Sequence, residues 1–99
     1  MLQTMKIDSY VVDVLMRDLV AHSRSSVAFL VYLQLYRQTH GAGRDRVAIS
    51  LQSIAELIGV SKRAVQGAIA HLIERRLIRR HKKGVTAVPV YAVLTPWIR

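Results

Sequence analysis

Apolar residues recur at helical spacing through the first part of the chain, interrupted by a short polar turn. Over residues 10–22 they repeat every three or four positions, and Ser9 precedes them as a candidate N-cap. The predicted apolar side of this helix consists of Val11, Val12, Leu15, Met16 and Leu19. A second helix is predicted over residues 26–39, and it is apolar almost all round. A helix with so little polar surface must bury more than one face.

The second half of the chain predicts two short amphipathic helices joined by a tight turn. They span residues 51–58 and 62–75, and Ala55 is small enough to let them cross closely. Gly59 supplies the left-handed backbone conformation that ends the first helix, and the Ser61 hydroxyl can cap the second. Three residues at helical spacing form the predicted buried stripe of the second helix: Val65, Ile69 and Leu72.

Three short segments rich in β-branched residues predict strands. Residues 46–49 precede the helix pair, and residues 77–82 and 88–94 flank a basic turn, as the two strands of a hairpin would. Pro96 lacks the backbone donor that a strand needs, so the last strand should end before it. We expect Trp97 to pack back on the domain or on a partner.

The order of these elements is similar to that of winged helix-turn-helix DNA-binding domains. A short strand, a helix, a Gly turn, a Ser-capped basic helix and a basic hairpin follow one another over residues 46–94. The resemblance implies a mainly α (α+β) fold in which helix 62–75 lies in the major groove of DNA and the hairpin forms the wing. Residues 1–45 resemble no family that we can name, and we expect them to form a helical pair for support or dimerisation within one domain, residues 1–99.

The charge distribution favours a polyanionic partner. The chain has a net charge of +9, and residues 51–99 hold nine Lys or Arg against two Glu, whereas residues 1–50 hold six against four Asp. Eight of those nine basic residues fall on the second predicted helix and the hairpin. The chain has no Cys, its start lacks the pattern of a signal peptide, and no apolar run reaches the roughly 18 residues of a membrane span. We therefore expect a cytoplasmic, nucleoid-associated protein.

The resemblance points to the exposed side of helix 62–75 as the surface that reads DNA. Arg63 can donate two hydrogen bonds to guanine and Gln66 can pair with adenine, although both also suit an ordinary solvated helix face. Lys62 and Ser61, at the helix start, are expected to meet phosphate. The full set of candidate DNA-binding residues is Ser61, Lys62, Arg63, Gln66, Gly67, Arg80, Lys82 and Lys83.

Strand alternation divides the basic residues of the predicted wing between two faces. Arg80 and Lys82 share one face, Arg79 and His81 share the other, and Lys83 lies at the tip. We expect Arg80, Lys82 and Lys83 to contact phosphate or the minor groove.

Two residues depart from the pattern usual in this family. Gly67 stands where a polar or basic residue is common, and a Gly inside a helix costs about 0.5–1 kcal/mol. That loss suggests close approach of the helix backbone to DNA or to the wing. Arg76 stands where many members have the Gly that ends the recognition helix, so we expect the turn into strand 77–82 to be made differently. Arg75 and Arg76 can also complement the helix dipole.

The sequence contains no pattern typical of an enzyme or a metal site. The four histidines, His22, His40, His71 and His81, lack the close spacing of metal ligands. No nucleophile–base pair, positioned carboxylate pair or dinucleotide-binding fingerprint is evident. We therefore expect no catalytic activity, no cofactor and no small-molecule ligand.

These observations favour sequence-specific or semi-specific binding of double-stranded DNA, most directly by a transcriptional regulator of prokaryotic, viral or plasmid type. The alternative is a DNA-binding module of a replication or partition initiator from a plasmid, phage or virus. A third interpretation, a winged-helix module for protein–protein interaction, would suit a neutral or acidic second helix and wing, and both are basic here.

The apolar surface of the predicted helix 26–39 raises the question of assembly. This helix offers more apolar surface than helix 10–22 can cover alone, so we expect a homodimer through helices 10–22 and 26–39. Such a dimer would place two recognition helices about 34 Å, or a multiple of it, apart. The alternative is a monomer in which helix 10–22 and Trp97 together close the patch.

Overall fold

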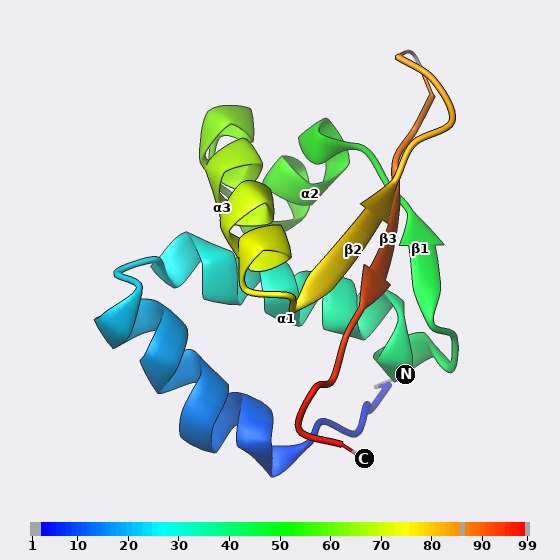
Figure 1. Ribbon diagram of the computed structural model, residues 1–99. Coiled ribbons are helices and arrows are strands. Elements are labelled where there is room, and N and C mark those ends of the chain that lie inside the picture. The colour runs from blue at the N-terminus through cyan, green and yellow to red at the C-terminus, as the bar shows by residue number, and fades with distance from the viewer. Residues whose placement is uncertain (1–2, 86, 99) are drawn as a thin grey trace.

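Helices form most of the molecule, and a small antiparallel sheet lies beside them (Figure 1). The computed structural model describes residues 3–85 and 87–98. In chain order the elements are η1 (Val11–Leu15), η2 (Asp18–His22), α1 (Ser26–Gln38), η3 (His40–Ala42), β1 (Arg46–Ala48), α2 (Leu51–Ile58), α3 (Lys62–Glu74), β2 (Ile78–His81) and β3 (Val90–Val93). This is the winged helix-turn-helix architecture that the sequence predicts. Each predicted strand is one to three residues shorter at its ends than expected.

The central element is α1. In Figure 1 it runs through the middle of the molecule, with α2 and α3 on one side and the N-terminal helical segment on the other. Its buried residues are Ala28, Phe29, Val31, Tyr32, Leu35 and Tyr36. One chain therefore covers most of the apolar surface of α1, so this surface does not by itself require a second subunit, and the homodimer stays a prediction. Leu30, 41% exposed, is the large apolar residue of α1 that stays at the surface.

The N-terminal helix, residues 9–22, is wider than an ordinary α-helix over η1 and η2. These turns have hydrogen bonds between residues five apart, such as Ser23 N–H to the Asp18 carbonyl at 3.0 Å. The wider turn aligns residues four apart, so the buried residues are Val11, Leu15 and Leu19. Val12 and Met16, which a period of 3.6 places on the same side, are exposed instead. The predicted cap by Ser9 is not formed. Ser9 itself lies within the helix, and no side chain caps the start of η1.

The helix-turn-helix has the caps that the sequence predicts. Gly59 ends α2 in the left-handed conformation, with φ of 77°. The Ser61 hydroxyl accepts a hydrogen bond from the Ala64 N–H at 3.1 Å, and Ser50 caps α2 in the same way through the Ser53 N–H at 3.1 Å. These bonds fix the angle between α2 and α3 and so the exposed face of α3.

The end of α3 corrects the prediction for Arg76. This residue itself takes the left-handed conformation, with φ of 58°, that Gly takes in many related domains. Its N–H bonds to the Ile73 carbonyl at 3.0 Å, and the Leu77 N–H bonds to the Leu72 carbonyl at 2.9 Å. These two bonds make the Schellman turn that usually accompanies a Gly at this point, so the turn into β2 keeps the usual geometry in spite of the Arg.

The sheet has the strand order β1-β3-β2, with all pairs antiparallel. Tyr91 of β3 lies opposite Arg80 of β2, and Ala92 lies opposite Arg79. Tyr91 is buried and Ala92 is half-buried. The two faces of the hairpin predicted from strand alternation are therefore present, one toward the helices and one on the outside of the sheet.

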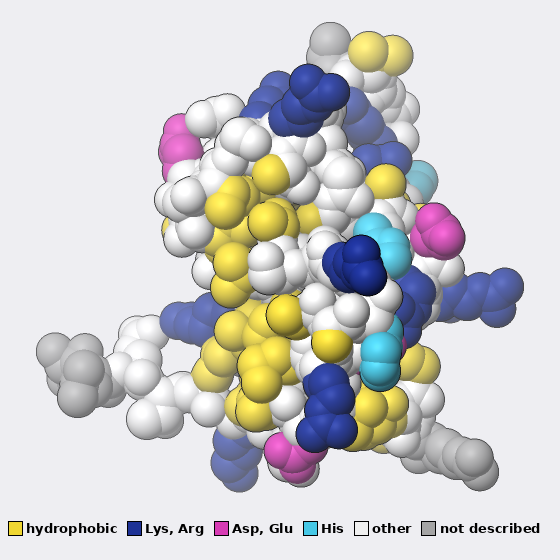
Figure 2. All heavy atoms as spheres, turned by 90° about the vertical axis from the view of Figure 1, so that its left-hand side faces the viewer, with side chains coloured by type: hydrophobic (Ala, Val, Ile, Leu, Met, Phe, Trp, Pro, Cys, Tyr) yellow, Lys and Arg dark blue, Asp and Glu magenta, His cyan; other side chains and the backbone are white. Residues whose placement is uncertain are grey.

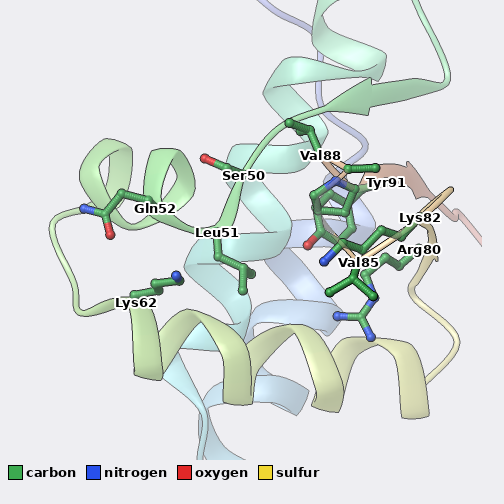
Figure 3. Close-up of a pocket in the computed structure, with 11 residues that line it drawn as sticks. Ser50, Leu51, Gln52, Lys62, Arg80, Lys82, Val85, Val88 and Tyr91 are labelled. Carbon is green, nitrogen blue, oxygen red and sulfur yellow. The ribbon is translucent and has the colours of Figure 1, made fainter.

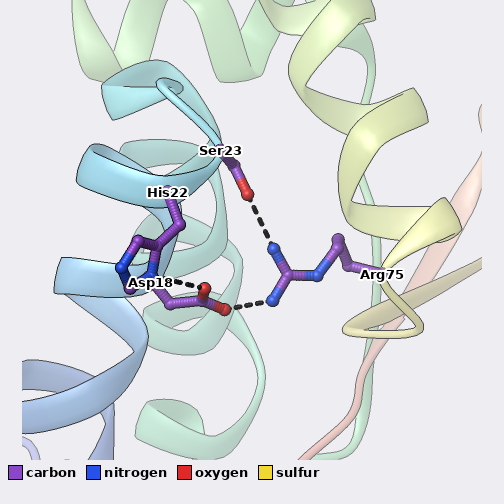
Figure 4. Close-up of polar contacts among 4 residues, drawn as sticks. All are labelled: Asp18, His22, Ser23 and Arg75. Carbon is purple, nitrogen blue, oxygen red and sulfur yellow. Dashed lines mark hydrogen bonds and ion pairs between the residues drawn. The ribbon is translucent and has the colours of Figure 1, made fainter.

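Three polar contacts and one aromatic stack attach the N-terminal helix and the residues beside it to the rest of the domain. At one end, Arg75, just after α3, pairs with Asp18 and donates to the Ser23 hydroxyl at 2.7 Å (Figure 4). At the other end, Trp97 stacks on Tyr10 with ring centroids 4.6 Å apart, and its indole N–H donates to Asp8 at 3.1 Å. Trp97 thus packs on its own domain.

The Asp18–Arg75 pair predicts a pH-dependent contribution to stability. The hydrogen bond from Arg75 holds the pKa of the Asp18 carboxyl below its ordinary value of 3.8. This contribution is complete above that value and is lost as the pH falls through the lowered pKa of the folded state. Because both side chains are about one-third exposed, Asp18→Asn should lower the free energy of unfolding by at most about 1 kcal/mol at neutral pH.

Urea denaturation at neutral and at acidic pH checks this expectation. The difference between the wild type and Asp18→Asn should shrink in acid, and the exposed Asp13→Asn variant serves as a matched control with little effect at either pH. A difference that is absent at neutral pH, or undiminished in acid, would contradict the role given to the pair.

Candidate nucleic-acid interface

The exposed side of α3 carries the side chains that the sequence analysis assigned to DNA contact. Lys62, Arg63, Gln66 and Gly67 are all exposed. The opposite side is buried in the domain through the predicted stripe and one further residue, namely Val65, Ala68, Ile69 and Leu72. Packing of this stripe leaves the other side of the first two turns of α3 facing solvent.

Gly67 leaves the middle of this exposed side open. A Cβ built on Gly67 meets no protein atom within 4 Å. The wing therefore does not approach the helix backbone at this point, and that part of the expectation for Gly67 is wrong. Close approach of a DNA backbone at Gly67 stays a prediction.

Ser61 has a structural role at the start of α3. Its hydroxyl oxygen accepts the hydrogen bond from the Ala64 N–H, and its own hydrogen remains available to donate. The N–H groups of the first helical turn beside it have no partner inside the helix. Ser61 and Lys62 therefore lie where the partial positive charge of a helix N-terminus favours an anion.

A cleft of about 270 Å³ separates the start of α2 and α3 from the wing (Figure 3). We call it the wing cleft, and its polar lining residues are Ser50, Gln52, Lys62, Arg80, Lys82 and Tyr91. Three of these side chains are cationic, and none of the described lining residues is acidic. The structure thus brings Arg80 and Lys82 together with Lys62, which the sequence could not place next to the wing.

Lys83 and Arg63 lie outside the wing cleft. Lys83 is exposed in the turn between β2 and β3, and Arg63 is exposed on α3. The ion pairs in the described part of the chain involve Asp18, Asp45 and their partners, and none involves the five basic residues Lys62, Arg63, Arg80, Lys82 and Lys83. Their charges are therefore not neutralised within the described residues.

A separate basic surface lies on the outer face of the sheet. Arg46 and Arg79 flank Ala92 across neighbouring strands, and His81 lies one row further along. Arg46, Arg79 and His81 line a pocket of about 230 Å³ there, together with Arg80, which also lines the wing cleft. The sequence analysis separated Arg79 and His81 from Arg80 and Lys82, but it gave no role to Arg46. The pairing of β1 with β3, which brings Arg46 near Arg79, depends on a contact between distant parts of the chain.

Tyr91 and Gln52 are the lining residues of the wing cleft that sequence reasoning missed. Tyr91 belongs to a strand whose apolar neighbours predict only a core position. Gln52 is an exposed residue in the first turn of α2 and carries no distinctive pattern. Tyr91 lies directly opposite Arg80 across β2 and β3, so both side chains are on the same face of the sheet. A correct register for the predicted hairpin would have been enough to infer this relation.

Comparison with family models gives one match. The model of the helix-turn-helix domain matches residues 25–78, more than half of the chain. The chain belongs to the helix-turn-helix domain family. The matched segment begins before α1 and ends at the start of β2, so it includes α1, which the sequence analysis had assigned to the N-terminal helical pair.

The helix-turn-helix domain family is a DNA-binding family and not an enzyme family, so membership indicates DNA binding. Comparison with curated proteins and with solved structures gives no match. In residues 3–85 and 87–98, no helix is both long enough and apolar enough to cross a membrane.

Proposed function

We propose that this helix-turn-helix protein binds double-stranded DNA in a sequence-specific or semi-specific manner and acts as a transcriptional regulator. The observation that carries the proposal is the shared orientation of two basic surfaces. The exposed start of α3 and the wing meet at one cleft, with Lys62 from α3 and Arg80 and Lys82 from the wing around it. In this arrangement α3 enters the major groove while the wing holds the adjacent phosphate backbone.

Arg63 and Lys83 have different roles in the proposed complex. Arg63, exposed in the first turn of α3, reads a guanine edge in this proposal, whereas Lys83 in the wing turn neutralises phosphate. Gln66, one turn further along α3 and also exposed, reads an adenine. Base reading and phosphate binding are thus divided between the helix and the wing.

Arg63→Ala and Lys83→Ala test this division. Arg63→Ala should cost about 1–3 kcal/mol on the preferred duplex and relax discrimination at one base pair. Lys83→Ala should weaken binding to preferred and random duplexes to a similar extent. The preferred duplex is obtained by selection from a random pool, and affinities are measured by fluorescence anisotropy at fixed salt. If both variants lose the same affinity on both duplexes, α3 does not read bases.

The selection also separates a regulator from an initiator. An enriched palindrome supports a dimeric transcriptional regulator, and an enriched direct repeat supports a replication or partition initiator. Absence of any enriched sequence would leave nonspecific DNA binding in place of both. We expect the selection to enrich a palindrome. We also expect the protein to be cytoplasmic and nucleoid-associated.

We also propose a homodimer formed through the N-terminal helix and the exposed part of α1. Figure 2 shows the face on the left-hand side of Figure 1, where hydrophobic side chains extend from the level of α2 and α3 down to the level of the N-terminal helix. The exposed large apolar residues of these two elements are Tyr10, Val12, Val14, Met16, Val20 and Leu30. A two-fold axis beside this helix would pair the same surface on both chains.

Light scattering at micromolar concentration tests the dimer. We expect a mass near twice 11.2 kDa, and Val12→Asp should shift it to the monomer without loss of folding, because Val12 is 46% exposed. The control is Val11→Asp. Val11 is fully buried, so this variant should unfold the chain, whereas Val12→Asp should leave it folded. A wild-type mass near 11.2 kDa would exclude the dimer.

A further inference from the structure

The hydroxyl of Tyr91 is buried without a hydrogen-bond partner. The Tyr91 side chain is fully buried, and its Oη contacts no donor or acceptor of the described chain at hydrogen-bond geometry. Tyr32, the other fully buried tyrosine, has its Oη hydrogen-bonded to the Leu94 carbonyl at 2.9 Å. Buried polar groups are rarely left unpaired in folded proteins, and a Phe would fill the position of Tyr91 with the same ring. The unpaired hydroxyl therefore requires an explanation outside the core.

This hydroxyl lies at the wall of the wing cleft. Tyr91 lines the cleft together with Arg80 and Lys82, and Figure 3 shows the Tyr91 ring beside these two side chains. Arg80 and Lys82 are exposed and long, so they can move aside or rearrange around an incoming group. A ligand that draws the two cations toward itself would at the same time gain access to the hydroxyl behind them.

The opposite wall of the wing cleft is the start of α2. Leu51 and Gln52 line the cleft there, and the first hydrogen bond inside the helix runs from the Ile54 N–H to the Ser50 carbonyl at 3.1 Å. The N–H groups of Leu51 and Gln52 precede that bond and have no partner within the helix. They contribute the positive end of the α2 dipole to the cleft.

The chemistry of the wing cleft selects a compact anion with several acceptor oxygens. Three cationic residues, the first turn of α2 and Tyr91 line this cleft of about 270 Å³. Burial raises the pKa of the Tyr91 hydroxyl above its ordinary value of 10.0, and the nearby Arg80 opposes only part of that rise, so the hydroxyl stays protonated and donates. Phosphate offers oxygen acceptors to every one of these groups.

We infer that the wing cleft binds one phosphate group of the DNA backbone, and that the Tyr91 hydroxyl donates a hydrogen bond to one of its oxygens beside Arg80 and Lys82. This inference rests on the proposed function, and it adds a fixed phosphate position between the wing and the start of α2. Such a contact would set the register of α3 along the groove, because a phosphate held from two sides cannot slide.

Tyr91→Phe in the full chain is the most direct test, because it removes one oxygen atom only. Affinity for duplex DNA should fall about 10- to 100-fold, which is the effect of one hydrogen bond to a charged acceptor. The melting temperature should stay the same or rise, because an unpaired buried hydroxyl disappears. The slope of log affinity against log salt should not change, because no charge is removed.

Two matched controls separate binding from structure. Tyr32→Phe removes the hydroxyl that is paired with Leu94, so its melting temperature should fall while DNA affinity of the folded protein is kept. Arg80→Ala and Arg79→Ala remove the same charge from opposite faces of β2. Arg80→Ala should weaken binding and reduce the salt slope by about one, and Arg79→Ala should leave both nearly unchanged.

Inorganic phosphate, added at constant ionic strength, distinguishes the two sources of the phosphate group. Stabilisation of the wild type but not of Tyr91→Phe means that the cleft also accepts the free ion, whereas no stabilisation means that it accepts phosphate as part of the duplex. Both results agree with the inference if Tyr91→Phe weakens DNA binding. Unchanged DNA affinity in Tyr91→Phe overturns the inference and leaves the proposed function intact, whereas a wild type that fails to bind duplex DNA overturns both.

Discussion

Burial of α1 on several sides is the constraint on which the rest of the structure depends. Its apolar residues pack against α2, α3, the N-terminal helix and the sheet, and Tyr32 and Leu35 are fully buried at the centre. This core positions α3 so that its own apolar stripe faces inward. The basic side of α3 must then face solvent on the side where the wing projects. The position of the proposed DNA-binding surface is thus a consequence of core packing.

The same packing places basic residues of α3 and the wing around one cleft of this 99-residue chain. Arg75 is neutralised by Asp18 near the N-terminal helix, which removes one positive charge from the end of α3. The remaining cations around the wing cleft have no acidic neighbour among the described lining residues. Their mutual repulsion destabilises the free protein and is relieved when a polyanion binds. The unpaired hydroxyl of Tyr91 fits this pattern, because stability is commonly lower at binding sites.

Local signals in the sequence were sufficient to predict the helix-turn-helix and the wing. Ser50, Gly59 and Ser61 define helix ends through bonds to residues close in sequence, and alternation assigns Arg80 and Arg79 to opposite faces. Features that depend on contacts between distant residues could not be predicted in this way. The wide turns of the N-terminal helix changed which of its residues are buried, and Arg76 took a conformation that its own side chain disfavours.

The coverage of α1 was misjudged for the same reason. Counting apolar residues on one helix does not reveal that α2, α3, the sheet and the N-terminal helix all share its surface. The sequence also placed Lys62, Arg80 and Lys82 in separate elements, and only the pairing of β2 with β3 and the packing of α3 bring them to one cleft.

The salt dependence of duplex binding tests the central claim most directly. If the five unpaired cations of α3 and the wing meet phosphate or bases, log affinity should fall against log salt with a slope of about −4 to −5. The double variant Arg46→Ala, Arg79→Ala, on the outer face of the sheet, should retain that slope. A flat response in the wild type, or a slope that depends on Arg46 and Arg79 instead, would contradict the proposed DNA-binding face.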